Sequence, residues 1–234
     1  MLLRVLLLLT LLPATLLADA APARSAKDAL QGFNTLIGTW KGTGTPSVGT
    51  REERDRGFWI ETIRWQWRFK GKDTWLQADV EKGKHFTRFE LRYQPKTDDF
   101  SLVATTADKQ ALTFTGGLAN KRLTVDRTDP KTKETQRLVF SLLHANRHLY
   151  AAETRPDGVT MFAKAYQVGA TKQGVPFASG DTAPECVVSG GLGTMQVSYM
   201  GKTYYVCCSG CRDAFKEEPA KYVKEFEARK KVAR

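Results

Sequence analysis

The residues best suited to chemistry are four cysteines that lie close together toward the end of the chain. Twenty residues separate Cys186 from Cys207, and three separate Cys207 from Cys211. Cys208 directly follows Cys207. Thiolates are ligands for zinc and for soft ions such as Cu(I). The cluster therefore predicts a metal site built from Cys186, Cys207 and Cys211, with Cys208 as a further candidate ligand.

The segment around these cysteines predicts elements that would bring them together. Residues 195–198 and 203–207 have the composition of two short strands joined by a turn, and a short helix containing Cys211 follows. A second helix is expected from about residue 220 to 230, with Pro219 in its first turn. A thiolate at a strand end and another one helical turn later can converge on one ion, and Cys186 would reach it from the far side of the hairpin.

The run YMGKTYYVCCSGCRDAFKEEPAKYVKEF resembles the YHS and TRASH domains, a treble-clef-like metal-binding family. The resemblance implies that the module binds a soft heavy metal, copper or zinc, in metal sensing, trafficking or resistance. The matching residues are Cys186, Cys207, Cys211, Phe215, Pro219, Lys221 and Tyr222.

The module also departs from that family's pattern. Ser189 stands where many members have a second cysteine, and no histidine follows His148. Three thiolates remain, and the fourth position is open to Cys208, Ser189, water or a ligand from a partner. Such a set also suits Cu(I), which prefers soft sulfur. Disulfides are the alternative state, because thiols oxidise outside the cytoplasm.

The first twenty residues predict export. Arg4 supplies a positive start, an apolar run follows, and Ala18-Asp19-Ala20 has the small-x-small cleavage pattern of a secretory signal peptide. The apolar run is shorter than the roughly 20 residues that span a bilayer. We therefore expect cleavage near Ala20, a periplasmic or secreted mature protein, and no stable membrane span.

Residues 29–168 predict an antiparallel sheet closed on itself. Apolar and polar residues alternate from Trp59 to Phe69 and in several later runs, and turn-forming residues separate the runs. About nine strands in sequence, with no helical crossover, favour an up-and-down barrel because closure removes exposed edges. The fold class predicted is mainly β: this barrel, followed by a small α+β, treble-clef-like cysteine module.

The start of the barrel segment, Leu36-Ile37-Gly38-Thr39-Trp40-Lys41-Gly42, resembles the Gly-x-Trp opening of lipocalin-like barrels. The resemblance implies that Trp40 plugs one end and that the barrel has a cavity for a small apolar ligand. The candidates to line such a cavity are Trp59, Trp65, Trp67 and Phe69. Their alternative role is ordinary core packing, which is the more common fate of buried aromatic residues.

Residues 169–184 are rich in Gly, Ser, Thr and Pro and predict a linker to a module at residues 185–228. A unit of that size needs a metal or disulfides to fold. The net charge of +11 arises from basic residues that alternate with acids, so no nucleic-acid partner is expected. No nucleophile, base and orienting group occur in an enzyme-like arrangement, which argues against catalysis.

The sequence thus predicts an exported heavy-metal-binding protein, with copper or zinc carriage, sensing or resistance as its role. The alternative is a carrier of a small apolar ligand held in the barrel, in which the cysteine module is only structural, stapled by metal or disulfides.

Overall fold

The computed structural model describes residues 24–174 and 184–232. The predicted signal peptide, residues 1–20, lies outside the described residues, as does the central part of the predicted linker, residues 175–183. Among the helices of the described ranges, none is both long and apolar enough to cross a membrane.

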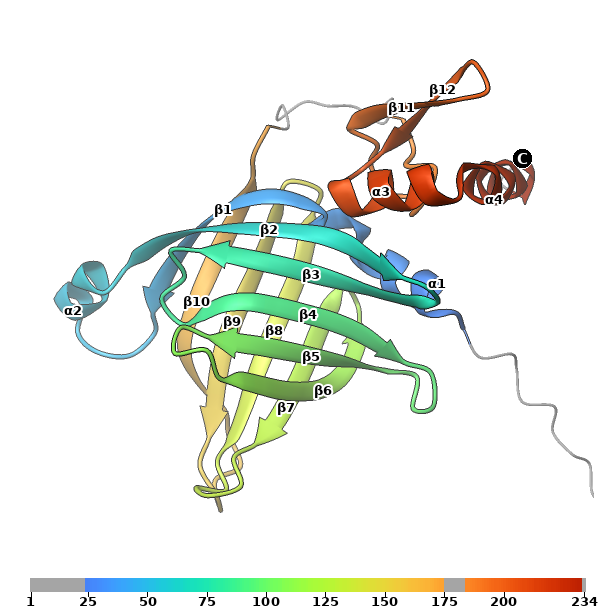
Figure 1. Cartoon of the computed structure of the whole chain (residues 1–234). Coiled ribbons are helices and arrows are strands. Elements are labelled where there is room, and N and C mark those ends of the chain that lie inside the picture. The colour runs from blue at the N-terminus through green and yellow to red at the C-terminus, as the bar shows by residue number, and fades with distance from the viewer. Residues whose placement is uncertain (1–23, 175–183, 233–234) are drawn as a thin grey trace, which may run out of the picture.

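Ten antiparallel strands follow one another around a closed barrel, and β1 pairs with β10 to close it (Figure 1). The prediction of a mainly β, up-and-down barrel is confirmed, with ten strands in place of about nine. The last strand runs to Lys172, past the residue where we expected the linker to begin. The strands are β1 (Gly38–Pro46), β2 (Trp59–Lys70), β3 (Asp73–Glu81), β4 (Phe86–Gln94), β5 (Asp99–Thr106), β6 (Ala111–Ala119), β7 (Arg122–Thr128), β8 (Thr135–His144), β9 (Arg147–Arg155) and β10 (Ala163–Lys172).

Short helices flank the first strand. Helix α1 (Ala26–Leu30) and the 3-10 helix η1 (Gln31–Leu36) precede β1 and pack against β3, β4 and β8. Trp40 on β1 is fully buried, and its indole N–H donates to the Leu36 carbonyl at 2.6 Å. Helix α2 (Arg51–Arg56) connects β1 to β2 and begins with a capping box formed by Thr50 and Glu53.

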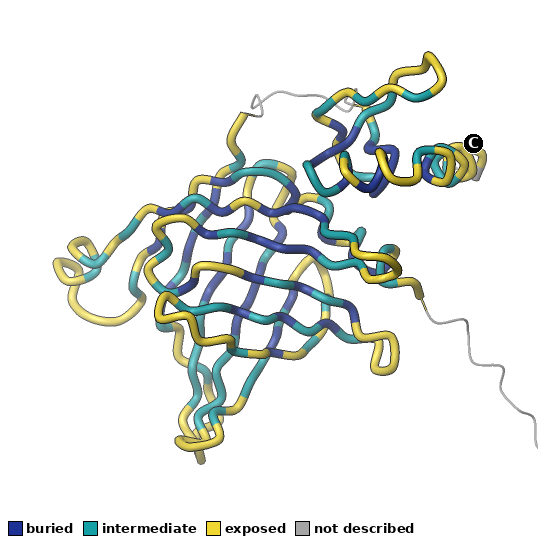
Figure 2. The backbone as a smooth tube through the Cα atoms, in the orientation of Figure 1, coloured by how far each residue is buried: buried dark blue, intermediate teal, exposed yellow. Residues whose placement is uncertain are grey.

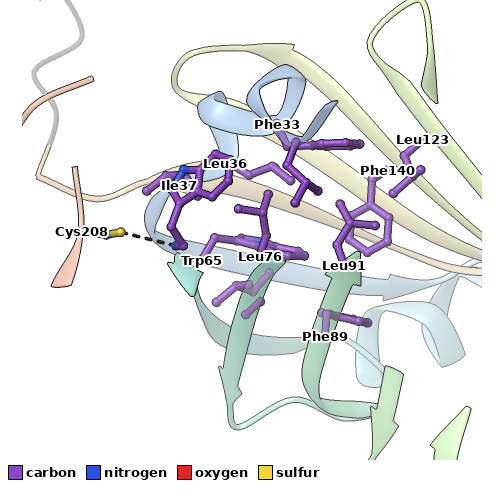
Figure 3. Close-up of a cluster of buried hydrophobic side chains, with 14 of the residues drawn as sticks. Phe33, Leu36, Ile37, Trp65, Leu76, Phe89, Leu91, Leu123, Phe140 and Cys208 are labelled. Atoms are coloured by element: carbon purple, nitrogen blue, oxygen red, sulfur yellow. Dashed lines mark hydrogen bonds between the residues drawn. The ribbon is translucent and has the colours of Figure 1, made fainter. Parts of the chain in front are cut away.

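The buried residues of the barrel strands form one aromatic-rich core (Figure 2). The Phe89 and Phe140 rings meet edge to face at 5.5 Å, and the Trp65 ring lies 6.1 Å from each of them. Tyr150 stacks on Phe140 at 5.5 Å. Figure 3 shows Trp65, Phe89 and Phe140 together with Leu76, Leu91 and the η1 residues Phe33 and Leu36. Burial of large apolar side chains of this kind is the main source of the barrel's stability.

The C-terminal module has two strands and two helices, as the sequence predicts. Strands β11 (Met195–Tyr199) and β12 (Lys202–Val206) form a hairpin, and helices α3 (Ser209–Glu217) and α4 (Pro219–Val232) follow. Met200 and Gly201 have positive φ angles of 48° and 72°, which the two-residue turn requires. Figure 1 shows α3 lying over the β2 side of the barrel and α4 near α1.

One histidine lies buried inside the barrel. His148 on β9 is 1% exposed, its ring meets Trp40 edge to face at 4.4 Å, and neither ring nitrogen has a hydrogen-bond partner among the described residues. Burial and, as a smaller contribution, the positive charge of Lys172 on β10 together lower the pKa of His148 to about 3. The folded barrel therefore holds this imidazole neutral.

We expect the chain to lose stability as the pH falls from 6.5 toward 3, because the unfolded histidine takes up a proton that the buried one cannot. Between pH 7 and pH 4.5 this linkage amounts to about 2.5 kcal/mol. Urea unfolding of the wild type and of His148→Leu at both pH values measures it. The variant should lose less stability than the wild type by that amount, and equal losses would contradict the assignment.

Candidate metal centre

Three cysteine sulfurs of the module converge on one point. The Sγ atoms of Cys186, Cys207 and Cys211 all lie within 4.8 Å of one another, and the Cys207 and Cys211 sulfurs are 3.5 Å apart. All four cysteines of the chain are buried free thiols. The fold thus brings together the three thiols that the sequence pattern predicts as metal ligands.

Cys186 is held by a tight loop ahead of the hairpin. Its main-chain N–H donates to the Gly191 carbonyl at 2.6 Å, and its carbonyl accepts from the Gly190 N–H at 2.9 Å. Gly190 has a φ of +75°, a conformation that favours glycine. The Ser189 N–H then donates to the Cys186 sulfur at 3.4 Å. The loop therefore fixes the sulfur and offers it a main-chain donor.

The other two sulfurs come from the junction between β12 and α3. Cys207 directly follows the last residue of β12, and Cys211 lies in the first turn of α3. A parallel bridge between Cys186 and Tyr205 of β12 ties the loop to the same junction. The three ligand candidates thus belong to two segments that the main chain itself cross-links.

The three converging thiols have pKa values that are shifted in opposite directions. Hydrogen bonds from Cys207 and from Cys211 lower the pKa of Cys186 to about 2. The bond to Cys186 raises the pKa of Cys207, and burial raises the pKa of Cys211. Of the three converging thiols, Cys186 therefore loses its proton most readily, and Cys207 and Cys211 hold theirs more strongly. A metal would displace those protons, because thiolate is the form that binds metal.

The donor set fits a soft metal ion. In a tetrahedral site with metal–sulfur distances of about 2.3 Å, the sulfurs lie about 3.8 Å apart. The 3.5 Å between the Cys207 and Cys211 sulfurs and the 4.8 Å limit for the whole group bracket that value. A small adjustment of the side chains would complete the geometry.

Ser189 contacts two of the three converging cysteines, Cys186 and Cys207. Its side chain is fully buried, and its Oγ is 3.3 Å from the Cys207 sulfur. The hydroxyl also accepts from the Gly191 N–H at 3.4 Å. The residue that interrupts the family's cysteine pattern therefore still faces the thiols.

Cys208 has a different environment from the other three. It is not a member of the group within 4.8 Å, and its sulfur lies 3.9 Å from that of Cys207. It accepts a hydrogen bond at 3.4 Å from the main-chain N–H of Trp67 on β2, the contact drawn as a dashed line in Figure 3. Cys208 thus joins the module to the barrel.

This contact uses a part of β2 that has no partner on one side. The first residue of β1, Gly38, pairs with Trp65, so residues 66–70 of β2 extend beyond β1. The start of α3 covers this overhang so closely that a Cβ on Gly210 would lie 1.7 Å from the Trp67 carbonyl oxygen. Only glycine allows that approach.

Side chains continue the interface on both sides of the cluster. The Ser209 hydroxyl donates to Gln66 at 2.8 Å. The Asn34 amide donates to the Ser189 carbonyl at 2.9 Å and accepts from the Trp67 indole at 3.1 Å. Sequence reasoning missed Asn34, Gln66 and Cys208 as interface residues, and no local pattern marks them, because each acts on a residue more than a hundred positions away.

The four aromatic residues expected to line a cavity do not form one group, although Trp67 and Phe69 stack on each other at 5.8 Å. Trp65 lies in the barrel core, and Trp67 reaches Asn34 in η1. Phe69 packs on Tyr222 of α4 at 6.5 Å, and Trp59, at the other end of β2, lies 5.1 Å from the His85 ring. Their shared position on one strand does not place them around one ligand.

Residues 193–225 match the YHS domain family, which confirms the YHS resemblance of the module. The match includes Cys207 and Cys211 and begins after Cys186. Among curated proteins, none matches the chain. A solved structure titled "Structure of EF1p2_mFAP2b bound to DFHBI" aligns with 61% of this chain and 98% of its own at 12% identity, with a TM-score of 0.27. The YHS match and the thiol cluster together indicate a metal-binding module, and the barrel fits a lipocalin-like fold.

The close approach of α3 to β2 predicts that Gly210→Ala destabilises the chain. In an isolated helix the change would add up to about 1 kcal/mol of stability. Against the Trp67 carbonyl we expect a net loss of about 1–3 kcal/mol instead, measured by urea unfolding. The control is Gly117→Ala on β6, where the nearest atom to a new Cβ is 3.5 Å away. Stabilisation by Gly210→Ala would show that the contact is absent in solution.

Proposed function

We propose that this chain is an exported protein that binds one heavy-metal ion, copper or zinc, for carriage, sensing or resistance. Cys186, Cys207 and Cys211 are its ligands. The observation that carries the proposal is the convergence of three buried sulfurs within 4.8 Å of one another. The signal-peptide pattern of residues 1–20 supports export.

The arrangement of the thiols favours a metal over disulfides. A disulfide would use two of the three converging sulfurs and leave the third as a buried free thiol. One ion uses all three and replaces the protons held by Cys207 and Cys211. The module also gains the folding free energy that a unit of its size lacks. Cys208 is already engaged by the Trp67 N–H, which favours a docking role for it over a fourth ligand.

The alternative function, carriage of a small apolar ligand in the barrel, has less support. Trp65, Phe89, Phe140 and Tyr150 pack ring against ring where such a ligand would lie. A tightly packed lumen suits a scaffold that supports the module.

Elemental analysis of protein purified under reducing conditions tests the ligand set. We expect about one equivalent of copper or zinc per wild-type chain, and loss of most of it in a Cys207→Ser/Cys211→Ser variant. Cys208→Ser is the matched control, because it removes a neighbouring thiol outside the converging group, and it should keep the metal. Equally low metal content in the wild type and the double variant would refute the proposal.

Ser189→Cys should convert the three-thiolate site into one with four thiolates, because the Ser189 side chain already faces the Cys207 sulfur. With Co²⁺ as the probe, the sulfur-to-metal charge-transfer absorbance should rise by about a third, and Zn²⁺ should bind at least about tenfold more tightly. Ser198→Cys adds a thiol on the exposed face of β11 and should change neither quantity. An unchanged spectrum for Ser189→Cys would place Ser189 outside the coordination sphere.

A further inference from the structure

A cleft of about 340 Å³ lies where the module meets the barrel. We define the interdomain cleft by Cys207 and Cys208 on the module side and by Arg64, Gln66 and Lys172 on the barrel side. Its volume is at the lower end of the range for small-molecule sites, about 300–1,000 Å³. The cleft can therefore hold a molecule of about the size of a short peptide.

Within the described part of the chain, the two cysteines that line this cleft are also the two that keep some exposed surface. Cys186 and Cys211 are 0% exposed, whereas Cys207 and Cys208, which line the cleft, are 9% and 8% exposed. A metal ion that enters or leaves the cluster by the shortest route would pass through it.

The charge of the cleft opposes a bare metal cation. Arg64 and Lys172 line it, and no aspartate or glutamate occurs among the described residues of its wall. Arg64 has a partner outside the cleft, Glu81 at 3.4 Å, and that half-exposed pair is screened by solvent. A pathway for free Cu⁺ or Zn²⁺ would need acidic or neutral walls. The basic walls of this cleft favour an anionic ligand instead.

Lys172 is held in place by the end of η1 and the start of β1. Its ammonium donates to the Thr35 carbonyl at 3.3 Å and lies 5.2 Å from the Trp40 ring. A Cβ on Gly38 would lie 2.9 Å from Lys172 Cε, so the glycine leaves room for the lysine stem. Burial lowers the pKa of Lys172. Lys172 and Cys207 both line the cleft, so a molecule bound there can contact both.

On the basis of the proposed function, we propose that the interdomain cleft binds the metal as an anionic complex with a low-molecular-weight thiol. Arg64 and Lys172 attract and orient that complex beside Cys207. Transfer is then a ligand exchange: each metal–sulfur bond to the carrier that breaks is replaced by one to a protein thiolate. The thiol protons of Cys207 and Cys211 pass to the departing carrier thiolates or to water, so the step needs neither oxidant nor reductant.

The test compares two Cu(I) donors, the anionic glutathione complex and the cationic acetonitrile complex, in stopped-flow transfer to the metal-free full-length protein. In Arg64→Met/Lys172→Met, transfer from the glutathione complex should slow about tenfold and lose its dependence on salt. Transfer from the acetonitrile complex should stay the same or become faster. The control is Arg88→Met/Lys164→Met. Its Arg88 is as exposed as Arg64, at 50%, and also pairs with a carboxylate, that of Asp79 at 3.2 Å.

Equal rates for wild type and cleft variant with the glutathione donor would overturn the cleft proposal, as would equal slowing with both donors. The metal content at equilibrium separates this failure from failure of the proposed function. If the wild type and the cleft variant both bind one equivalent of copper, and the substitutions do not change the transfer rates of the two donors differently, only the cleft proposal is wrong. If neither holds copper, the metal site itself is wrong, and the cleft proposal with it.

Discussion

The arrangement of the whole molecule depends on one mismatch in strand length. Strand β2 has 12 residues, and β1 begins opposite its seventh, Trp65. The remaining main-chain groups of β2 face away from β3 without a strand to pair with, and buried main-chain groups must find partners. The start of α3 supplies them: the Cys208 sulfur accepts the Trp67 N–H, and Gly210 allows the helix to lie against the Trp67 carbonyl. The module is thereby fixed to the barrel at the residues that flank its thiol cluster.

This docking changes how the small module obtains its stability. Its own core is short of apolar residues and centres on Val187, Val206 and Phe215. A free unit of this size would depend on its metal for folding. Here Phe69 packs on Tyr222, and Lys27 pairs with Glu225 at 2.6 Å, so the barrel contributes contacts that a free module would not have. The metal-free module can therefore keep its thiols near their bound positions, which lowers the ordering cost of binding an ion.

The sequence was sufficient for features that depend on local pattern. Alternation along β2 and the turn residues between strands predicted the meander, and the spacing from Cys186 to Cys211 predicted which sulfurs converge. The interface was not predictable, because it depends on the register between β1 and β2, and no residue type encodes that register by itself. Cys208 illustrates the difference. Its position beside Cys207 suggested a further metal ligand, whereas its sulfur accepts from a main-chain N–H 141 positions away.

The thiol cluster at this interface has different surroundings on its module side and on its barrel side. Cys186 and Cys211 are completely buried, and the barrel reaches the cluster through Asn34 at Ser189 and through Trp67 at Cys208. A metal held by Cys207 would therefore lie one residue away from Cys208, whose sulfur accepts the N–H of Trp67 on β2. Metal binding would be linked thermodynamically to the docking of the overhang wherever these contacts differ between the metal-free and metal-bound states. Cysteines that only stabilised the module could lie far from the barrel. Here they lie at the interface, where metal occupancy and domain docking would affect each other.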